Sequence, residues 1–234
     1  MNIVDYIMIA FLLLFALKGF RRGLLPSIVN LASSLLVFVI AFYLKTPIST
    51  FLYENLPFFK FGGLTSLNII MYEALAFMIC LTVLTMTLSL IIKISNIIEK
   101  LLDITIIFAL PSKILGLVVG LIQTVVILYV ALFILSMPVF DVPFLSESKY
   151  APIILSKTPI VSTVTNDAIK TFDEIAKFTK NEININDVDN TNGKIVDIML
   201  KNDIVKIDSI NLLNEKEKIK LINLDELVNK YKED

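Results

Sequence analysis

The chain has 234 residues, of which 56 % are hydrophobic, and its formal net charge is −1. Soluble domains are about 45–50 % apolar, so this composition does not fit an ordinary soluble protein. Histidine is absent, which removes the commonest general base and the commonest zinc ligand, and the single cysteine, Cys80, excludes an intramolecular disulfide.

The small net charge hides two different parts of the chain. Residues 1–138 carry eight basic and five acidic side chains, whereas residues 139–234 carry thirteen lysines and seventeen acids. We therefore expect a transmembrane domain over residues 1–138 and a polar helical region over residues 139–234.

Four long apolar stretches lie in the first part. About 20 helical residues are needed to cross the hydrocarbon core of a bilayer. Three stretches meet this length, and the first does so if it continues past Lys18 to Phe20. The prediction is an all-α, polytopic membrane protein with four transmembrane helices and a small C-terminal helical appendage. The stretches are Ile3–Leu17, Leu24–Leu44, Ala74–Ile92 and Ile114–Met137.

The turn between the first two stretches holds the only arginines of the chain, Arg21 and Arg22, between Gly19 and Gly23. So short a connection must reverse quickly, and glycine permits positive φ and close approach. Arginine is always charged and binds phosphate through two parallel hydrogen bonds. The pair is therefore expected to fix the topology and to contact anionic lipid headgroups or a partner.

A second interpretation pairs one arginine with an acid at the membrane surface, as part of a functional centre. Asp5 and Glu73 lie near the opposite ends of their spans, so Glu99 and Asp103 are the better partners. Both interpretations stay open at this point.

Lysine and arginine in short loops set the orientation of a multi-pass protein. Six lie in the first and third loops, and four lie in the second loop and just after the fourth span. This count predicts that both termini, and residues 139–234, lie outside the cytoplasm. The second loop, residues 45–73, is rich in Phe and Pro and is expected on the membrane surface.

The fourth stretch begins with Lys113 and contains Gly116, Gly120 and Thr124 at intervals of four. Small residues at this spacing let transmembrane helices pack closely, so these three are expected to mediate helix packing. Gln123 lies in mid-span and needs a partner inside the bundle. The second stretch offers four candidates, which are Ser27, Asn30, Ser33 and Ser34.

The tail begins with several prolines, which predict breaks in helical structure. Apolar residues at helical spacing from Val161 to Ile175 then predict an amphipathic helix of about 18 residues. Further helical patterns cover Ile195–Leu200 and Leu224–Val228. The polar break at residues 186–193 matches a calcium loop only at Asp187 and Asp189, so no metal site is expected.

Signatures of catalysis are missing from the sequence. It contains no G-x-S-x-G, H-E-x-x-H, Walker or Rossmann pattern. We therefore expect no enzyme activity, no cofactor and no nucleic-acid partner. The alternative to a supporting membrane protein is an oligomeric channel or transporter subunit, because four spans are few for a monomeric carrier.

Residues 4–33, "VDYIMIAFLLLFALKGFRRGLLPSIVNLAS", resemble the amino-terminal signature of the colicin V production protein family (CvpA). The shared features are Asp5 and Tyr6, an apolar run, a glycine, a basic residue and a second helix. Residues 112–135 resemble the fourth helix of that family, with Lys113, Gly116 and Gly120 in place. The family usually has an acid or Asn at the position of Ser112 and Arg at that of Lys113, and it often has an Arg–Gly pair at 123–124.

The resemblance covers residues 4–137 and implies a multi-pass inner-membrane protein without established enzyme activity. It implies a role in colicin V production or export and in envelope homeostasis. Expected partners are membrane lipids at Arg21 and Arg22, a second copy of the chain, or other envelope and export proteins.

Overall fold

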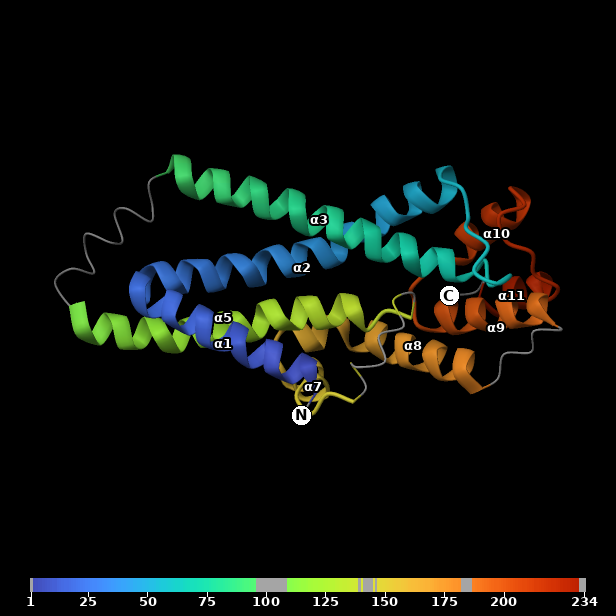
Figure 1. Ribbon diagram of the computed structural model, residues 1–234. Coiled ribbons are helices and arrows are strands. Elements are labelled where there is room, and N and C mark those ends of the chain that lie inside the picture. The colour runs from blue at the N-terminus through green and yellow to red at the C-terminus, as the bar shows by residue number, and fades with distance from the viewer. Residues whose placement is uncertain are drawn as a thin grey trace. The chain divides into compact units, whose positions relative to one another are not determined.

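The computed structural model describes residues 2–95, 109–138, 140, 145, 147–181 and 187–231. All regular structure in these residues is helical (Figure 1). Four of the helices are long and apolar enough to cross a membrane. These are α1 (Ile3–Arg22), α2 (Leu24–Asn55), α3 (Leu67–Ile94) and α5 (Ala109–Leu135). The prediction of an all-helical protein with four candidate spans is therefore confirmed.

The second loop is shorter than predicted. Helix α2 continues through Pro47 to Asn55, and α3 begins at Leu67, so only residues 56–66 connect them. The predicted loop over residues 45–73 was bounded by the ends of two apolar stretches, and this prediction was wrong because both helices continue past those stretches. Tertiary contacts can hold a helix together past a proline such as Pro47. One such contact comes from Lys218, which donates to the carbonyl oxygens of Tyr53 and Glu54 at the C-terminal end of α2.

By its internal contacts the chain divides into two compact units. Unit 1 comprises Met1–Tyr43, Ile79–Leu135 and Val142–Val164, and unit 2 comprises Leu44–Met78, Ser136–Asp141 and Thr165–Asp234. The boundary thus runs through α2 and α3. This division rests on contacts in space, whereas the predicted boundary at residue 138 separates an apolar from a polar stretch of sequence. The predicted transmembrane and polar domains therefore stay a prediction.

Unit 1 is built around the contact between α1 and α5, which lie side by side (Figure 1). Between α2 and α5, Phe38 meets the edge of Tyr129 at a centroid distance of 5.8 Å, and Phe133 stacks on Tyr129. Offset and edge-to-face rings of this kind add to the stabilisation from burial. A further cluster joins α1 and α5 to α7 (Ala151–Lys157) through Met8, Leu128, Leu132 and Ala151.

Unit 2 combines the C-terminal end of α2 and the start of α3 with the tail from Thr165 onward. The tail helices are α8 (Val161–Asn181), α9 (Val188–Lys201), α10 (Ile207–Glu215) and α11 (Leu224–Tyr231). Their buried faces carry Phe172, Ile175, Ile195, Met199 and Leu213. The predicted amphipathic helix is present and extends to Asn181. Asp187, in the predicted polar break, accepts from the amide of Asn190 and caps α9.

Two short helices do not appear among the predicted elements, α7 and α10. Pro152 was read as a helix breaker, but it lies at the start of α7, where its missing N–H would have no intrahelical acceptor in any case. The proline therefore begins this helix instead of interrupting one.

A buried ion pair links α2 to α3 within unit 2. Lys45 donates to one carboxylate oxygen of Glu73, and the hydroxyl of Ser49 donates to the other. Lys45 is 8 % exposed and Glu73 is 3 % exposed. A buried charge is tolerated only when it is paired and hydrogen-bonded, and both conditions are met here.

Candidate functional site

The turn between α1 and α2 is a tight reversal centred on Gly23. Its φ of 80° lies in the left-handed region, which residues with a Cβ avoid. The Gly23 amide donates to the Gly19 carbonyl at 3.0 Å and caps α1. The Ser27 hydroxyl donates to the Gly23 carbonyl at 2.7 Å. These bonds satisfy backbone groups that the end of α1 would otherwise leave unpaired.

The same turn is attached to the beginning of α5. The amide of Leu24, which has no acceptor within its own helix, donates to the Ser112 hydroxyl at 3.0 Å. Ser112, one of the positions that differ from the family signature described above, thus accepts a hydrogen bond from the turn.

Glycines bring the backbones of α1 and α5 into direct contact. A Cβ on Gly19 would overlap the carbonyl oxygen of Gly116, and a Cβ on Gly116 would lie 2.5 Å from the Gly19 oxygen. A Cβ on Gly120 would lie 2.8 Å from the Phe15 oxygen. All these distances are shorter than a carbon–oxygen contact allows, so only glycine fits at these three positions. The Thr124 hydroxyl donates to the Gly120 oxygen at 2.7 Å and is fully buried.

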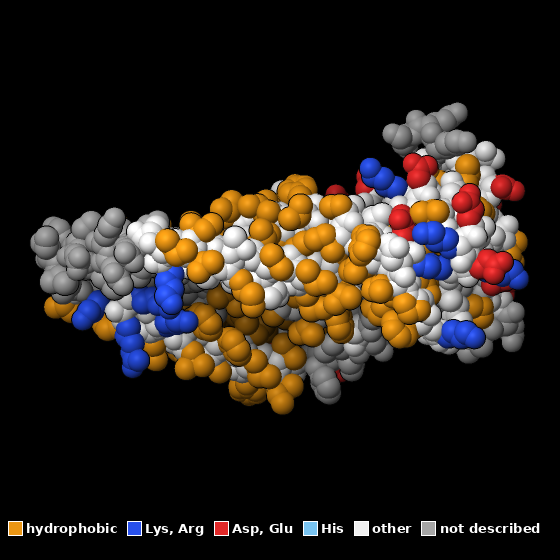
Figure 2. All heavy atoms as spheres, turned by 90° about the horizontal axis from the view of Figure 1, so that it is seen from above, with side chains coloured by type: hydrophobic (Ala, Val, Ile, Leu, Met, Phe, Trp, Pro, Cys, Tyr) orange, Lys and Arg blue, Asp and Glu red, His pale blue; other side chains and the backbone are white. Residues whose placement is uncertain are grey.

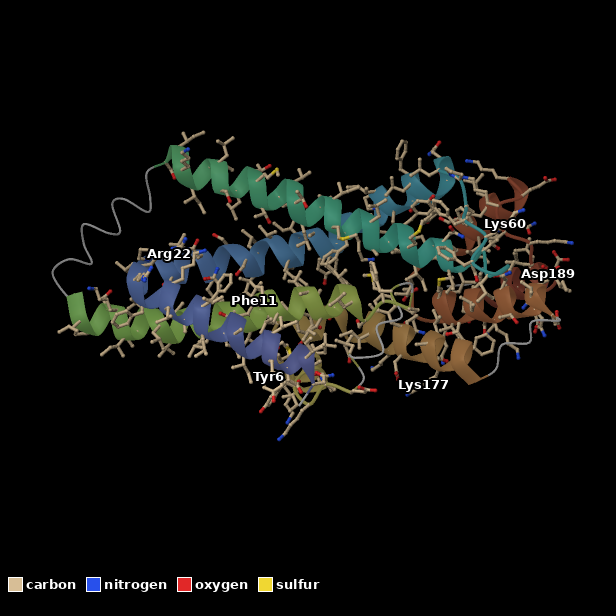
Figure 3. All side chains as sticks on the ribbon, in the orientation of Figure 1. Tyr6, Phe11, Arg22, Lys60, Lys177 and Asp189 are labelled. Atoms are coloured by element: carbon tan, nitrogen blue, oxygen red, sulfur yellow. The ribbon has the colours of Figure 1, made fainter. Side chains whose placement is uncertain are left out.

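Exposed cations surround this packed end of the unit. We call Lys18, Arg21, Arg22 and Lys113 the basic rim; all four are exposed. Figure 2 shows Lys and Arg side chains gathered beside a surface of hydrophobic side chains, and Figure 3 labels Arg22 where α1 ends. The Lys18 ammonium lies over the Phe15 ring at 5.2 Å. Within the described part of the chain, no acid pairs with the rim. Glu99 and Asp103 lie outside the described residues, so the second interpretation stays a prediction.

Asp5 lies in a different environment from the rim. It is fully buried near the start of α1. Its Oδ1 accepts from the Ser148 hydroxyl at 2.6 Å and the Tyr150 amide at 3.3 Å, and its Oδ2 accepts from the Asn2 amide at 2.9 Å. The carboxylate therefore ties α1 to the segment that starts α7. Sequence reasoning did not find Ser148, because nothing local marks a residue 143 positions away as a partner.

A groove of about 520 Å³ lies between α2, α3 and α5 within unit 1. Gln123 lines it together with Asn30, Ser33 and Ser34, as the sequence led us to expect. No hydrogen bond joins Gln123 to these candidates, however. The fourth candidate, Ser27, donates instead to the Gly23 carbonyl in the turn between α1 and α2. Asn30 and Ser34 donate to carbonyls of their own helix.

The chain matches the family model described as "Colicin V production protein" over residues 4–159. It belongs to the colicin V production protein family. No curated protein and no solved structure matches the chain. The family match confirms the resemblance and extends it past residue 137. The matched residues include the turn between α1 and α2, the basic rim and the segment that binds Asp5. Most of the tail lies outside the match.

Proposed function

We propose that this family member is a non-enzymatic protein of the bacterial cytoplasmic membrane that supports production or export of a colicin V-type peptide toxin and envelope homeostasis. The observation that carries the proposal is the family match over four apolar helices. Two acids of the described spans also support it, because Asp5 and Glu73 are both buried in contacts that join helices.

Within this function the basic rim binds anionic headgroups on the cytoplasmic side. Four exposed cations lie at one end of the α1–α5 contact, and two of them are arginines, whose planar fork fits phosphate. Each cation near an anionic membrane surface contributes about 1 kcal/mol to attraction. The close glycine contact between α1 and α5 sets the positions at which these side chains leave the backbone.

Complementation tests the proposed function. The gene is deleted in its host, and in a colicin V-producing strain the resident family member is replaced by this chain. We expect restored toxin in the medium, measured by growth-inhibition zones, and restored resistance of the host to detergent. A membrane-inserted chain that restores neither property contradicts the proposal.

Lipid binding at the rim is tested by native mass spectrometry in micelles that contain phosphatidylglycerol and phosphatidylcholine. We expect the R21A/R22A variant to retain fewer phosphatidylglycerol molecules than the wild type. The matched control, K201A/K206A, removes two exposed cations from the tail and should leave retention unchanged. Equal retention by all three proteins contradicts the lipid role.

A further inference from the structure

The groove between α2, α3 and α5 contains polar side chains without hydrogen bonds. Among the described residues, Ser33, Thr85, Ser89 and Gln123 line the groove and form no hydrogen bond through their side chains. Thr85 and Ser89 are exposed, and Gln123 is half-buried. Hydrocarbon cannot donate or accept hydrogen bonds, so an occupant made only of acyl chains leaves these groups unsatisfied.

The residues that α3 and α5 present to the groove follow the spacing of a helix-packing seam. On α3 the positions are Leu81, Thr85, Leu88 and Ile92, which we call the α3 seam; on α5 they are Gln123, Ile127, Val130 and Ile134. Both sets repeat at intervals of four, three and four, the pattern by which helices interlock along a shared axis. Eleven residues rise about 17 Å, or roughly three turns. The groove is therefore shaped for another helix, and no charged side chain lines it.

The helix that fits is α3 of a second copy. The α3 seam carries the Thr85 hydroxyl, and Ser89 lines the groove beside the seam; both hydroxyls complement the amide of Gln123. Two copies in one bilayer share their topology, so a two-fold axis along the membrane normal brings the α3 helices together in parallel. Each seam then meets itself, as an isologous interface requires.

We propose that the chain forms a two-fold dimer in the membrane, in which the α3 helices pack along the α3 seam and each closes the groove of the other copy. The Thr85 and Ser89 hydroxyls of one copy then lie against the Gln123 amide of the other. The contact satisfies groups that each copy alone leaves unpaired.

Disulfide crosslinking in native membranes tests the dimer. In a C80A background, a cysteine at Leu88 lies on the α3 seam, and a cysteine at Leu90 lies on the opposite side of the same helix, where the side chain is 57 % exposed. After oxidation we expect at least tenfold more disulfide-linked dimer from L88C than from L90C. Equal crosslinking, no crosslinking of L88C, or linkage of L88C to a different membrane protein overturns the proposal.

A second experiment tests the hydrogen bonds in the groove with the native cysteine retained. Two differently tagged copies are reconstituted in lipid, and their association constant is measured by energy transfer. T85V and Q123L should each weaken association about three- to tenfold, the range of one interhelical hydrogen bond. T87V is the matched control, because the Thr87 hydroxyl donates to the Val83 carbonyl of its own helix at 2.8 Å. A monomeric wild type, or association that T85V and Q123L both leave unchanged, overturns the proposal.

Discussion

At the scale of the residue, the absence of a side chain decides the packing of α1 on α5. Gly19, Gly116 and Gly120 each lie so close to the facing backbone that a methyl group has no space. In lipid, helices gain little from burying apolar surface against one another, so close backbone contact is a main source of attraction. The bulky, exposed residues of the same helices face outward, as Leu14 and Val118 do.

We predict that G120A lowers the free energy of unfolding by about 1–3 kcal/mol, the usual cost of an added group in a filled space. The new Cβ would lie 2.8 Å from the Phe15 oxygen and 3.0 Å from the Gly19 Cα, so the helices must separate. The measurement is loss of helicity during denaturant titration in micelles. V118I adds one carbon at a position that is 47 % exposed and should change little. Equal effects of the two substitutions would contradict the close contact.

At the scale of the element, polar contacts fix how helices pair. The Lys45–Glu73 ion pair joins α2 to α3, and in the tail Asp197 on α9 accepts from the Lys230 ammonium at 2.7 Å and the Tyr231 hydroxyl at 2.8 Å on α11. The first pair is buried and the second is partly exposed, so their expected energetic weights differ.

Replacing one partner of the Lys45–Glu73 pair should destabilise the protein more than replacing both partners together. We expect E73Q or K45M alone to lower the free energy of unfolding by about 3–5 kcal/mol, because an uncompensated charge or polar group remains buried. The double variant E73Q/K45M should recover part of this loss. D173N is the control; Asp173 is exposed and paired with Lys177 at 2.5 Å, so its loss should cost less than about 1 kcal/mol. Additive effects in the double variant would show that Lys45 and Glu73 do not interact.

The Asp197 contact predicts a pH dependence. Burial raises the pKa of Asp197, but the hydrogen bonds from Lys230 and Tyr231 outweigh burial and leave the pKa below its ordinary value. A carboxyl with a lower pKa in the folded state stabilises that state above the unfolded pKa, near 3.9, and the contribution disappears as the pH falls through the folded pKa.

We therefore expect D197N to lower the melting temperature at pH 6, and the difference from the wild type to shrink as the pH falls below about 4. The loss at pH 6 corresponds to about 0.5–1 kcal/mol. Circular dichroism of the protein in micelles at a series of pH values provides the measurement. D225N, at an exposed position of α11, should show no such pattern. A difference between D197N and wild type that stays constant from pH 6 to pH 3 would contradict the assigned contact.

At the scale of the whole molecule, the exposed apolar surface and the position of the cations bear on membrane insertion. Large hydrophobic residues of the spans are exposed, among them Leu13, Leu36 and Met86 at 62 %, 53 % and 66 %. A surface of this kind requires lipid around it. The paired arginines lie at the first turn of the chain, where positive charge has the most weight in setting orientation.

We predict that R21A/R22A inverts a fraction of the molecules. Alkaline phosphatase fused to the C-terminus should be active in the wild type, which reports a position outside the cytoplasm, and a fluorescent-protein fusion should be dark. The variant should lose phosphatase activity and gain fluorescence, whereas K201A/K206A should match the wild type. An inactive phosphatase fusion of the wild type would contradict the predicted orientation.

The sequence by itself determined the helical class, the four candidate spans and the family, because hydropathy over 20 residues and the glycine spacing are local properties of the chain. Gly116 and Gly120 could be read as packing residues for the same reason, whereas the contact of Gly19 with Gly116 comes from the tertiary structure. The tertiary structure decided which residues meet across long separations. It joined Asp5 to Ser148 and Lys45 to Glu73, continued α2 past Pro47, and left Gln123 facing a groove instead of a partner. These features depend on contacts between distant segments, whose energies no local pattern in the sequence records.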